Sequence, residues 1–256
     1  MTEDAQPIPE PILGEVRSRY AAVRARIADA AARAGRSPDE ITLVGVAKRQ
    51  PPERVVAAIQ AGVRVLGQSY IQEARKVRPQ IEAKLAALAY DSGGAPPALE
   101  WRMVGRLQRN KAALAARLFD AIESVDRAPL ASTLSRRAHD EGRELEVLIQ
   151  VSLCGEDQKG GCQPADLMQL AESILELPNL RLEGLMTVPA ANPDPDASRP
   201  AFAALRELRE RLGSLDPRLA RGTLSMGMSG DLEVAIDEGA TLVRVGTALF
   251  GERIVG

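Results

Sequence analysis

The chain has 256 residues, of which 45% are hydrophobic, 27% are charged and only 3% are aromatic. Its 33 lysines and arginines are balanced by 35 aspartates and glutamates, so it lacks the basic excess of most nucleic-acid-binding proteins. No uncharged apolar stretch approaches the ~18 residues of a membrane-spanning helix. The acidic, proline-rich start has no apolar core like that of a secretory signal. We therefore expect a cytoplasmic protein that binds neither nucleic acid nor membranes.

Helix-like and strand-like segments alternate along the chain. Residues 14–34 are predicted to form an amphipathic helix, because apolar residues recur at helical spacing until Gly35. Short apolar runs then predict strands over 41–47, 63–67, 100–105, 121–125, 145–153, 181–186, 222–227 and 241–246. The predicted helices between them span 51–62, 70–88, 107–118, 128–141, 164–176, 198–213 and 230–238.

This alternation indicates parallel strand–helix–strand units. Eight such units in 256 residues match the ~250 residues typical of an α/β (β/α)₈ TIM barrel, here with an extra N-terminal helix. A doubly wound open sheet is the alternative. No shift of composition marks a domain boundary. We therefore expect a flexible segment over 1–12 and a single barrel domain over 13–256.

The cysteines and the histidine do not indicate a metal site or a catalytic site. Cys154 and Cys162 form no CxxC pair, and His139 is the single histidine, in a charged helical run. One histidine excludes an HExxH zinc site, and the polar setting of His139 argues against a Ser-His-Asp triad. We expect reduced cysteines, a surface histidine and no metal site.

Functional side chains of a TIM barrel lie at the carboxyl ends of its strands. Lys48 follows the most apolar strand, where loss of hydration favours the neutral amine that forms Schiff bases with aldehydes. The alternative is a lysine that extends into solvent. Arg244 lies inside a buried strand and needs an acceptor, which can be a ligand or an internal carboxylate such as Asp126 or Glu73.

Two glycine-containing loops suit an anion. GTLSMGMSGD ends the seventh predicted strand and opens a helix, and Gly246-Thr247 follows the eighth. TIM barrels often bind phosphate at these two loops, although the glycines can also be simple turns. An aldehyde-trapping lysine, an arginine and a phosphate cradle together suit pyridoxal 5′-phosphate (PLP). A Schiff-base aldolase without PLP fits these residues almost as well.

At these residues the chain resembles the pyridoxal phosphate homeostasis protein family, whose members look like the N-terminal barrel of alanine racemase, a fold type III PLP architecture. The resemblance spans about residues 14–253. Its carriers are LVGVAK (43–48), GQSYIQEA (67–74), WRMVGRLQRNK (101–111), ESVDR (123–127), LIQVSLCGEDQKGG (148–161), LEGLMTVPA (182–190) and LSMGMSGDLEVAIDEGATLVRVGTALFG (224–251).

The resemblance implies a role for each matching residue. Lys48 would carry PLP as a Schiff base, Arg244 would face the pyridine nitrogen, Ser225, Gly246 and Thr247 would hold the phosphate, Met226 would lie beside the cofactor, and Lys159 would lie near the site. The chain departs from the family pattern at Ser69, where an asparagine beside the cofactor is usual, at Arg102, where a histidine is usual, and at Gln50, where some relatives have a second lysine.

The resemblance further implies a monomeric PLP carrier that maintains PLP (vitamin B6) and amino-acid homeostasis without substrate turnover, and whose partners include apo PLP-dependent enzymes. The alternative is a fold type III amino-acid racemase. Alanine racemases add a C-terminal β-domain, and this sequence stops at Gly256, which favours the carrier. Arg244 favours it too, because a guanidinium gives the ring nitrogen no proton and leaves the ring a weaker electron sink.

Overall fold

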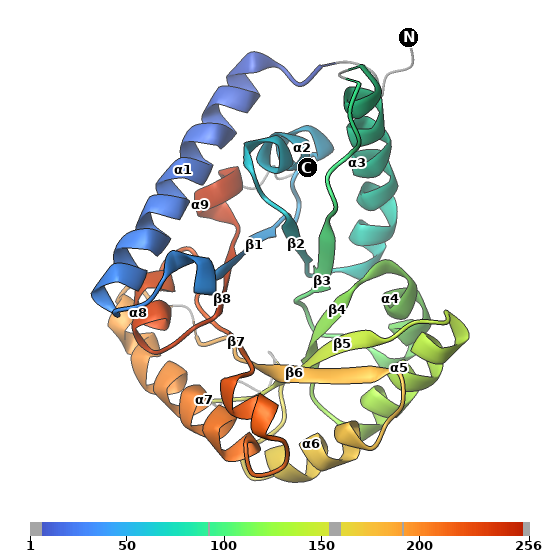
Figure 1. Ribbon diagram of the computed structural model, residues 1–256, viewed down its shortest axis with the longest axis vertical. Coiled ribbons are helices and arrows are strands. Elements are labelled where there is room, and N and C mark those ends of the chain that lie inside the picture. The colour runs from blue at the N-terminus through green and yellow to red at the C-terminus, as the bar shows by residue number, and fades with distance from the viewer. Residues whose placement is uncertain (1–6, 92, 154–159, 191, 253–256) are drawn as a thin grey trace.

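The computed structural model describes residues 7–91, 93–153, 160–190 and 192–252. In this part of the chain, eight parallel strands pair in sequence order and β8 pairs with β1, so the sheet closes into a barrel (Figure 1). The strands are β1 (Thr42–Val46), β2 (Val65–Gln68), β3 (Glu100–Met103), β4 (Ala121–Val125), β5 (Leu145–Gln150), β6 (Leu180–Met186), β7 (Thr223–Ser225) and β8 (Leu242–Val245). The predicted TIM barrel is confirmed, and the open sheet is wrong.

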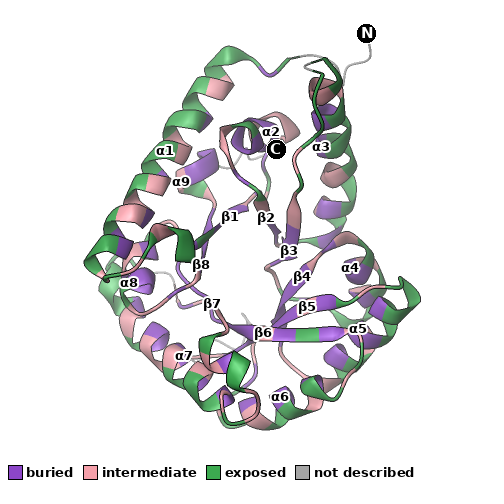
Figure 2. Ribbon diagram, in the orientation of Figure 1, coloured by how far each residue is buried: buried purple, intermediate pink, exposed green. Residues whose placement is uncertain are grey.

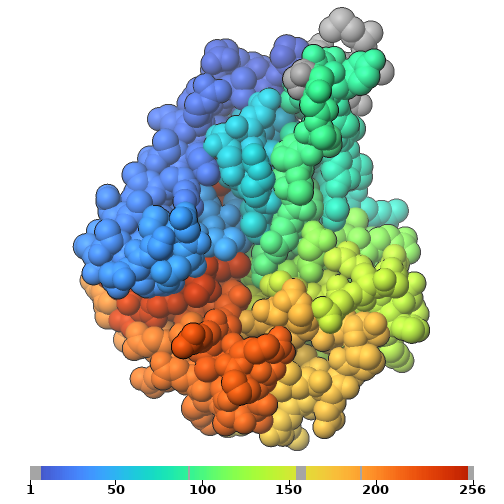
Figure 3. Space-filling view, in the orientation of Figure 1, coloured from blue at the N-terminus to red at the C-terminus, as the bar shows by residue number. Residues whose placement is uncertain are grey.

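Helices cover the outside of this barrel (Figure 1). They are α1 (Glu10–Arg33), α2 (Pro52–Ala61), α3 (Ile71–Asp91), α4 (Ala112–Leu118), α5 (Ala128–Asp140), α6 (Leu167–Leu175), α7 (Arg199–Leu212), α8 (Leu232–Asp237) and α9 (Thr247–Phe250). Colour changes continuously around the face seen in Figure 3, so units that are neighbours in sequence are neighbours around the barrel.

Burial explains why the strand segments are apolar. Most strand residues and the inward faces of the helices are buried, whereas the outward faces of the helices and the residues near the start of β1 and β6 are exposed (Figure 2). All five residues of β4 are buried, since a barrel strand contacts the lumen on one face and helices on the other. The alternation of apolar strands and amphipathic helices in the sequence therefore leads directly to this fold.

The extra N-terminal helix closes the outer ring where the chain begins and ends. α1 packs against α2, α8 and α9. Arg26 on α1 donates to Glu233 on α8 at 2.6 Å, which holds α1 against α8. α1 begins at Glu10, earlier than residue 14, and Ile8 is already buried.

Further differences from the predicted boundaries lie after the strands. β5 ends at Gln150 and not at residue 153. α4 begins only at Ala112, after a 3₁₀ turn over Arg109–Lys111. α9 follows β8 directly and was not expected. At these points the backbone departs from regular helix and strand geometry and forms the mouth of the barrel. The local spacing of apolar residues does not predict such departures.

Candidate functional site

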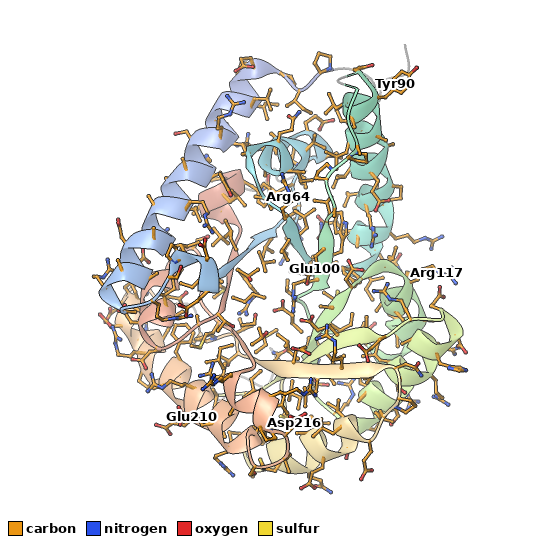
Figure 4. The ribbon with its side chains drawn as sticks, in the orientation of Figure 1. Arg64, Tyr90, Glu100, Arg117, Glu210 and Asp216 are labelled. Atoms are coloured by element: carbon orange, nitrogen blue, oxygen red, sulfur yellow. The ribbon has the colours of Figure 1, made fainter. Side chains whose placement is uncertain are left out.

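A cavity of about 400 Å³ lies at the carboxyl end of the barrel. It is lined by residues of β1 and β8 and of the loops that follow several strands: Val46, Lys48, Gln50, Ser69, Val104, Val188, Met228, Ser229, Gly230, Arg244, Gly246 and Thr247. The opposite end of the barrel is marked in Figure 4 by Arg64 and Glu100, at the amino ends of β2 and β3. The cavity therefore occupies the end at which TIM barrels carry function.

Lys48 has a defined position in this mouth. The turn after β1 places Arg49 at a φ of +55°, and the Arg49 N–H donates to a carboxylate oxygen of Glu73. The half-buried Lys48 directs its Nζ over the ring of Tyr70, 4.8 Å from the ring centroid. A cation over an aromatic face is attracted by the ring quadrupole, so the amine is held beside the cavity and does not extend freely into solvent.

A close backbone approach brings Ser69 into the same cavity. Gly105 lies just beyond β3, and a Cβ added there would fall 2.2 Å from the carbonyl oxygen of Ser69. Only glycine allows the loops after β2 and β3 to approach this closely. Ser69, the position where the family pattern has asparagine, therefore lines the cavity.

Arg244 forms one wall of the cavity from within β8 and is only 4% exposed. Its Nη2 donates to the carbonyl oxygen of Thr187 at 2.8 Å, and its Nη1 donates to the Ser225 hydroxyl. The carboxylate of Glu123 lies 3.9 Å from Nη1. Burial lowers the pKa of the Arg244 guanidinium, and Glu123 opposes this shift.

Glu123 links Arg244 to a second buried arginine deeper in the barrel. Its Oε1 accepts from Nε of Arg102 at 2.6 Å, and Arg102 also contacts Glu100 and Glu146. Burial by itself would lower the pKa of Arg102, but the three carboxylates raise it above its ordinary value. Arg102, which replaces the histidine usual in the family pattern, is thus part of the ion network below the cavity.

The expected internal partners of Arg244 are wrong. Asp126 pairs with the adjacent arginine, and Glu73 accepts from a backbone N–H of the turn after β1. Asp126 lies just beyond the end of β4, and Glu73 lies in the first turn of α3. Glu123 lies within β4 and faces the barrel interior, where it meets Arg244.

The loops after β7 and β8 are joined at one side of the cavity. Gly227 has a φ of +89°, and a Cβ there would lie 2.5 Å from a methyl carbon of α8. Asp231 accepts from the Met228 amide at 2.6 Å, which shapes the turn that follows. The Ser229 hydroxyl accepts from the Ala248 amide at 3.3 Å and connects this loop to the start of α9.

The structure brings together most of the side chains singled out from the sequence: Lys48, Ser69, Arg244, Gly246 and Thr247 line one cavity. Ser225 and Met226 are fully buried and do not line it. Ser225 instead bridges Arg244 and Glu123. Lys159 lies outside the described residues.

Two cavity residues carry polar groups that the sequence did not assign. Ser225 ends β7, and Ser229 follows four residues later in the loop after this strand, where it lines the cavity. The buried Gln50 donates from Nε2 to the Gly251 carbonyl at 3.4 Å, while its Oε1 has no hydrogen-bond partner among the described residues. A buried orphan acceptor is costly, so this oxygen is a contact that a bound molecule can satisfy.

The remaining sequence expectations concern residues away from the cavity. His139 is exposed near the end of α5, and Cys162 is a buried free thiol, whereas Cys154 lies outside the described residues. Within the described part of the chain, no group of three or more histidine, cysteine, aspartate and glutamate residues is arranged to hold a metal ion. No helix there is both long and apolar enough to span a bilayer.

The sequence matches a family model described as alanine racemase, N-terminal domain, over residues 19–254. It is 43% identical to the pyridoxal phosphate homeostasis protein of Pseudomonas aeruginosa, over 95% of this chain and 98% of that protein. The protein of the same name from Vibrio cholerae is 41% identical, over 90% of this chain and 93% of that protein.

Solved structures show the same relationship. PipY of Synechococcus elongatus with PLP bound is 34% identical, with a TM-score of 0.75 over 92% of this chain and all of that one (100%). An alanine racemase of Clostridium difficile has a TM-score of 0.67 at 15% identity, over 93% of this chain and 58% of that one. The second likeness concerns the barrel fold alone.

Proposed function

This chain belongs to the family of pyridoxal phosphate homeostasis proteins, built on the alanine racemase N-terminal domain, and from this we propose that it binds PLP at the carboxyl end of its barrel and maintains the cellular supply of this cofactor. One observation carries the proposal. A single cavity holds an amine, a buried guanidinium and hydroxyl-bearing loops, contributed by Lys48, Arg244, Ser229 and Thr247.

The groups around the cavity fit the groups of PLP. The Lys48 amine suits the aldehyde, with which it forms a Schiff base. Arg244 bonds through two of its N–H groups to described residues and has five in all, so donors remain for the ring nitrogen. The loops that carry Ser229, Gly246 and Thr247 offer hydroxyl and backbone donors of the kind that bind phosphate. Bound PLP supplies an aldehyde that captures amines and a ring that withdraws electrons.

The pairing of Arg244 with the ring nitrogen favours a protein that carries PLP over one that uses PLP in catalysis. A guanidinium donates a hydrogen bond to the ring nitrogen without transferring a proton, which leaves the ring a weaker electron sink. None of the described tyrosines lines the cavity that holds Lys48 and Arg244. The ring of Tyr70 lies against the Lys48 Nζ, Tyr20 lies on α1 beside Gly62, and Tyr90 lies at the far end of α3, away from the barrel (Figure 4). We infer that the protein is a carrier without racemase turnover.

The wider cellular role is part of the same proposal. We expect the protein to act as a cytoplasmic monomer that releases PLP to apo PLP-dependent enzymes. The resemblance implies that Lys159 is the obvious competitor of Lys48 for the aldehyde, because a second lysine near the site can exchange it by transimination.

Borohydride reduction of the PLP-loaded protein, followed by peptide mass mapping, tests the proposal. We expect a pyridoxyl adduct on Lys48, loss of that adduct in Lys48→Ala, and no change in Lys76→Ala, which removes an exposed lysine of α3 outside the cavity. An adduct on another lysine of the wild-type protein, with Lys48 unmodified, overturns the assignment.

A further inference from the structure

A second and larger cavity, of about 890 Å³, lies beside the first. It is formed by the loops after β2, β3 and β4 and lined by Ser69, Tyr70, Ile71, Gln72, Met103, Arg106, Leu107, Gln108, Arg109, Asn110, Lys111 and Arg127. Its volume falls within the ~300–1,000 Å³ of typical small-molecule sites. The site described above uses none of its basic residues.

This second cavity is strongly cationic in a chain whose net charge is −2. Arg106, Arg109, Lys111 and Arg127 line it, and none of the described residues that line it is acidic. Arg127 pairs with Asp126, whereas the structure gives Arg106, Arg109 and Lys111 no ion pair with any described residue. A concave surface lined by three cations without an ion-pair partner among the described residues attracts multiply charged anions.

The floor of the second cavity suits a ring. Met103 and Leu107 are each 1% exposed, and Ile71 is also buried. The ring of Tyr70 stands 49% exposed at the edge of the cavity. An apolar floor with an aromatic edge binds a planar ring, while the basic rim binds its charged substituent. The chemistry of the cavity therefore matches a heteroaromatic phosphate monoester.

The two cavities meet at a shared wall. Ser69 lines both of them, and Tyr70 of the second cavity holds the Lys48 ammonium of the first, 4.8 Å from its ring centroid. A ligand in the second cavity would thus lie next to Lys48 without occupying the wall formed by Arg244 and Thr247.

We propose that the second cavity is a non-covalent site for a phosphate monoester, which binds while Lys48 is occupied. Arg109 and Lys111 hold the phosphate, and Tyr70, Met103 and Leu107 contact the ring. The proposal rests on the proposed function for the identity of the first ligand. The ester is either a second B6 phosphate or another phosphorylated metabolite, and the two sources share the same binding chemistry.

The test uses PLP-loaded protein reduced with borohydride, so that Lys48 is blocked. The probe is 4-deoxypyridoxine 5′-phosphate, which has the ring and phosphate of PLP but no aldehyde, and its binding is measured by titration calorimetry. We expect one further equivalent to bind, and we expect Arg109→Gln/Lys111→Gln to weaken it at least about tenfold, since charge-assisted hydrogen bonds are lost. The matched control Arg75→Gln/Lys76→Gln removes exposed cations of α3 outside the cavity and should bind as the wild type does.

Three further probes define the ligand: the first two test the need for the phosphate, and the third distinguishes the two sources. Inorganic phosphate should compete with the probe, and 4-deoxypyridoxine without phosphate should not bind. Binding of adenosine 5′-monophosphate at similar affinity assigns the site to phosphate monoesters in general, whereas binding of the pyridine ester alone assigns it to B6 phosphates.

The proposal of a second site is refuted if no further equivalent of the probe binds, or if the probe binds the Arg109→Gln/Lys111→Gln protein as tightly as the wild type. Failure of the proposed function gives a different result, because borohydride reduction then leaves no pyridoxyl adduct on Lys48. In that case the titration of unmodified protein still reports the second site through its dependence on Arg109 and Lys111.

Discussion

The Ser225 hydroxyl of β7 donates a 2.5 Å hydrogen bond to Oε2 of Glu123 on β4. These strands are not neighbours in the sheet, so the contact crosses the barrel interior. Because Arg244 and Arg102 approach the same carboxylate, Glu123 balances two buried guanidinium groups below the cavity.

Glu123→Gln removes this balancing charge and leaves two buried arginines less compensated. We expect the free energy of unfolding to fall by about 3 kcal/mol, in the range for broken buried ion pairs. Urea titration measures it. The control is Glu15→Gln, whose carboxylate is 41% exposed and pairs with Arg19 and Arg54, and which should cost less than about 1 kcal/mol. Equal losses in both variants would show that Glu123 has no special role.

Thr247→Ala tests the phosphate cradle. It removes one hydroxyl from the cavity wall, and the loss of a hydrogen bond to a charged group should weaken PLP binding by roughly 1–3 kcal/mol. Pyridoxal, which lacks the phosphate, is the internal control: it should bind far more weakly than PLP, and its dissociation constant should not change in the variant. The cradle is refuted if pyridoxal and PLP bind the wild-type protein equally well.

Gly105→Ala tests the close approach that positions Ser69. The added Cβ would lie 2.2 Å from the Ser69 carbonyl oxygen, so the two loops must separate, and we expect a loss of about 1–3 kcal/mol of stability together with weaker PLP binding. Gly14→Ala on α1 is matched to it, because a Cβ there meets nothing within 4 Å. That control should leave PLP binding intact and stabilise the helix by up to about 1 kcal/mol. Similar denaturation midpoints for the two variants would contradict the steric argument.

The buried thiol of Cys162 predicts a pH dependence of stability. Burial raises its pKa from 9.0 to about 12, so between these values the unfolded chain loses the thiol proton while the folded chain keeps it. The unfolded state then binds fewer protons, and the free energy of unfolding falls as the pH rises through this range. Urea titrations at pH 8 and pH 10 should show a larger fall for the wild type than for Cys162→Ala. Identical falls would mean that the thiol ionises equally in both states.

The carrier reading predicts that PLP-loaded protein does not racemise L-alanine or other L-amino acids. Racemisation needs a base on each face of the carbanion, and none of the described tyrosines lines the cavity that holds Lys48. The loss of one positioned base costs about 10²–10⁴-fold in rate. Chiral chromatography after incubation measures the enantiomers. Turnover near the ~1–10³ s⁻¹ of ordinary enzymes, abolished in Lys48→Ala, would establish a racemase instead.

The sequence by itself determined the barrel and the end at which the site lies. Buried parallel strands need continuous apolar runs, and their covering helices need amphipathic ones, so both patterns are local and visible in the chain. Lys48 and Thr247 could be placed in one mouth, because the carboxyl ends of all strands in a closed parallel barrel meet at the same end.

Only the tertiary structure decided which groups face one another inside that mouth. Ser225 and Glu123 are 102 residues apart, and their contact depends on which side chains of β4 and β7 point into the lumen, which a local pattern does not specify. For the same reason Arg244 meets Glu123 and not Asp126 or Glu73. The second cavity, too, forms only when the loops after β2, β3 and β4 are folded side by side. Each loop contributes one part of the wall, and no single loop forms a cavity.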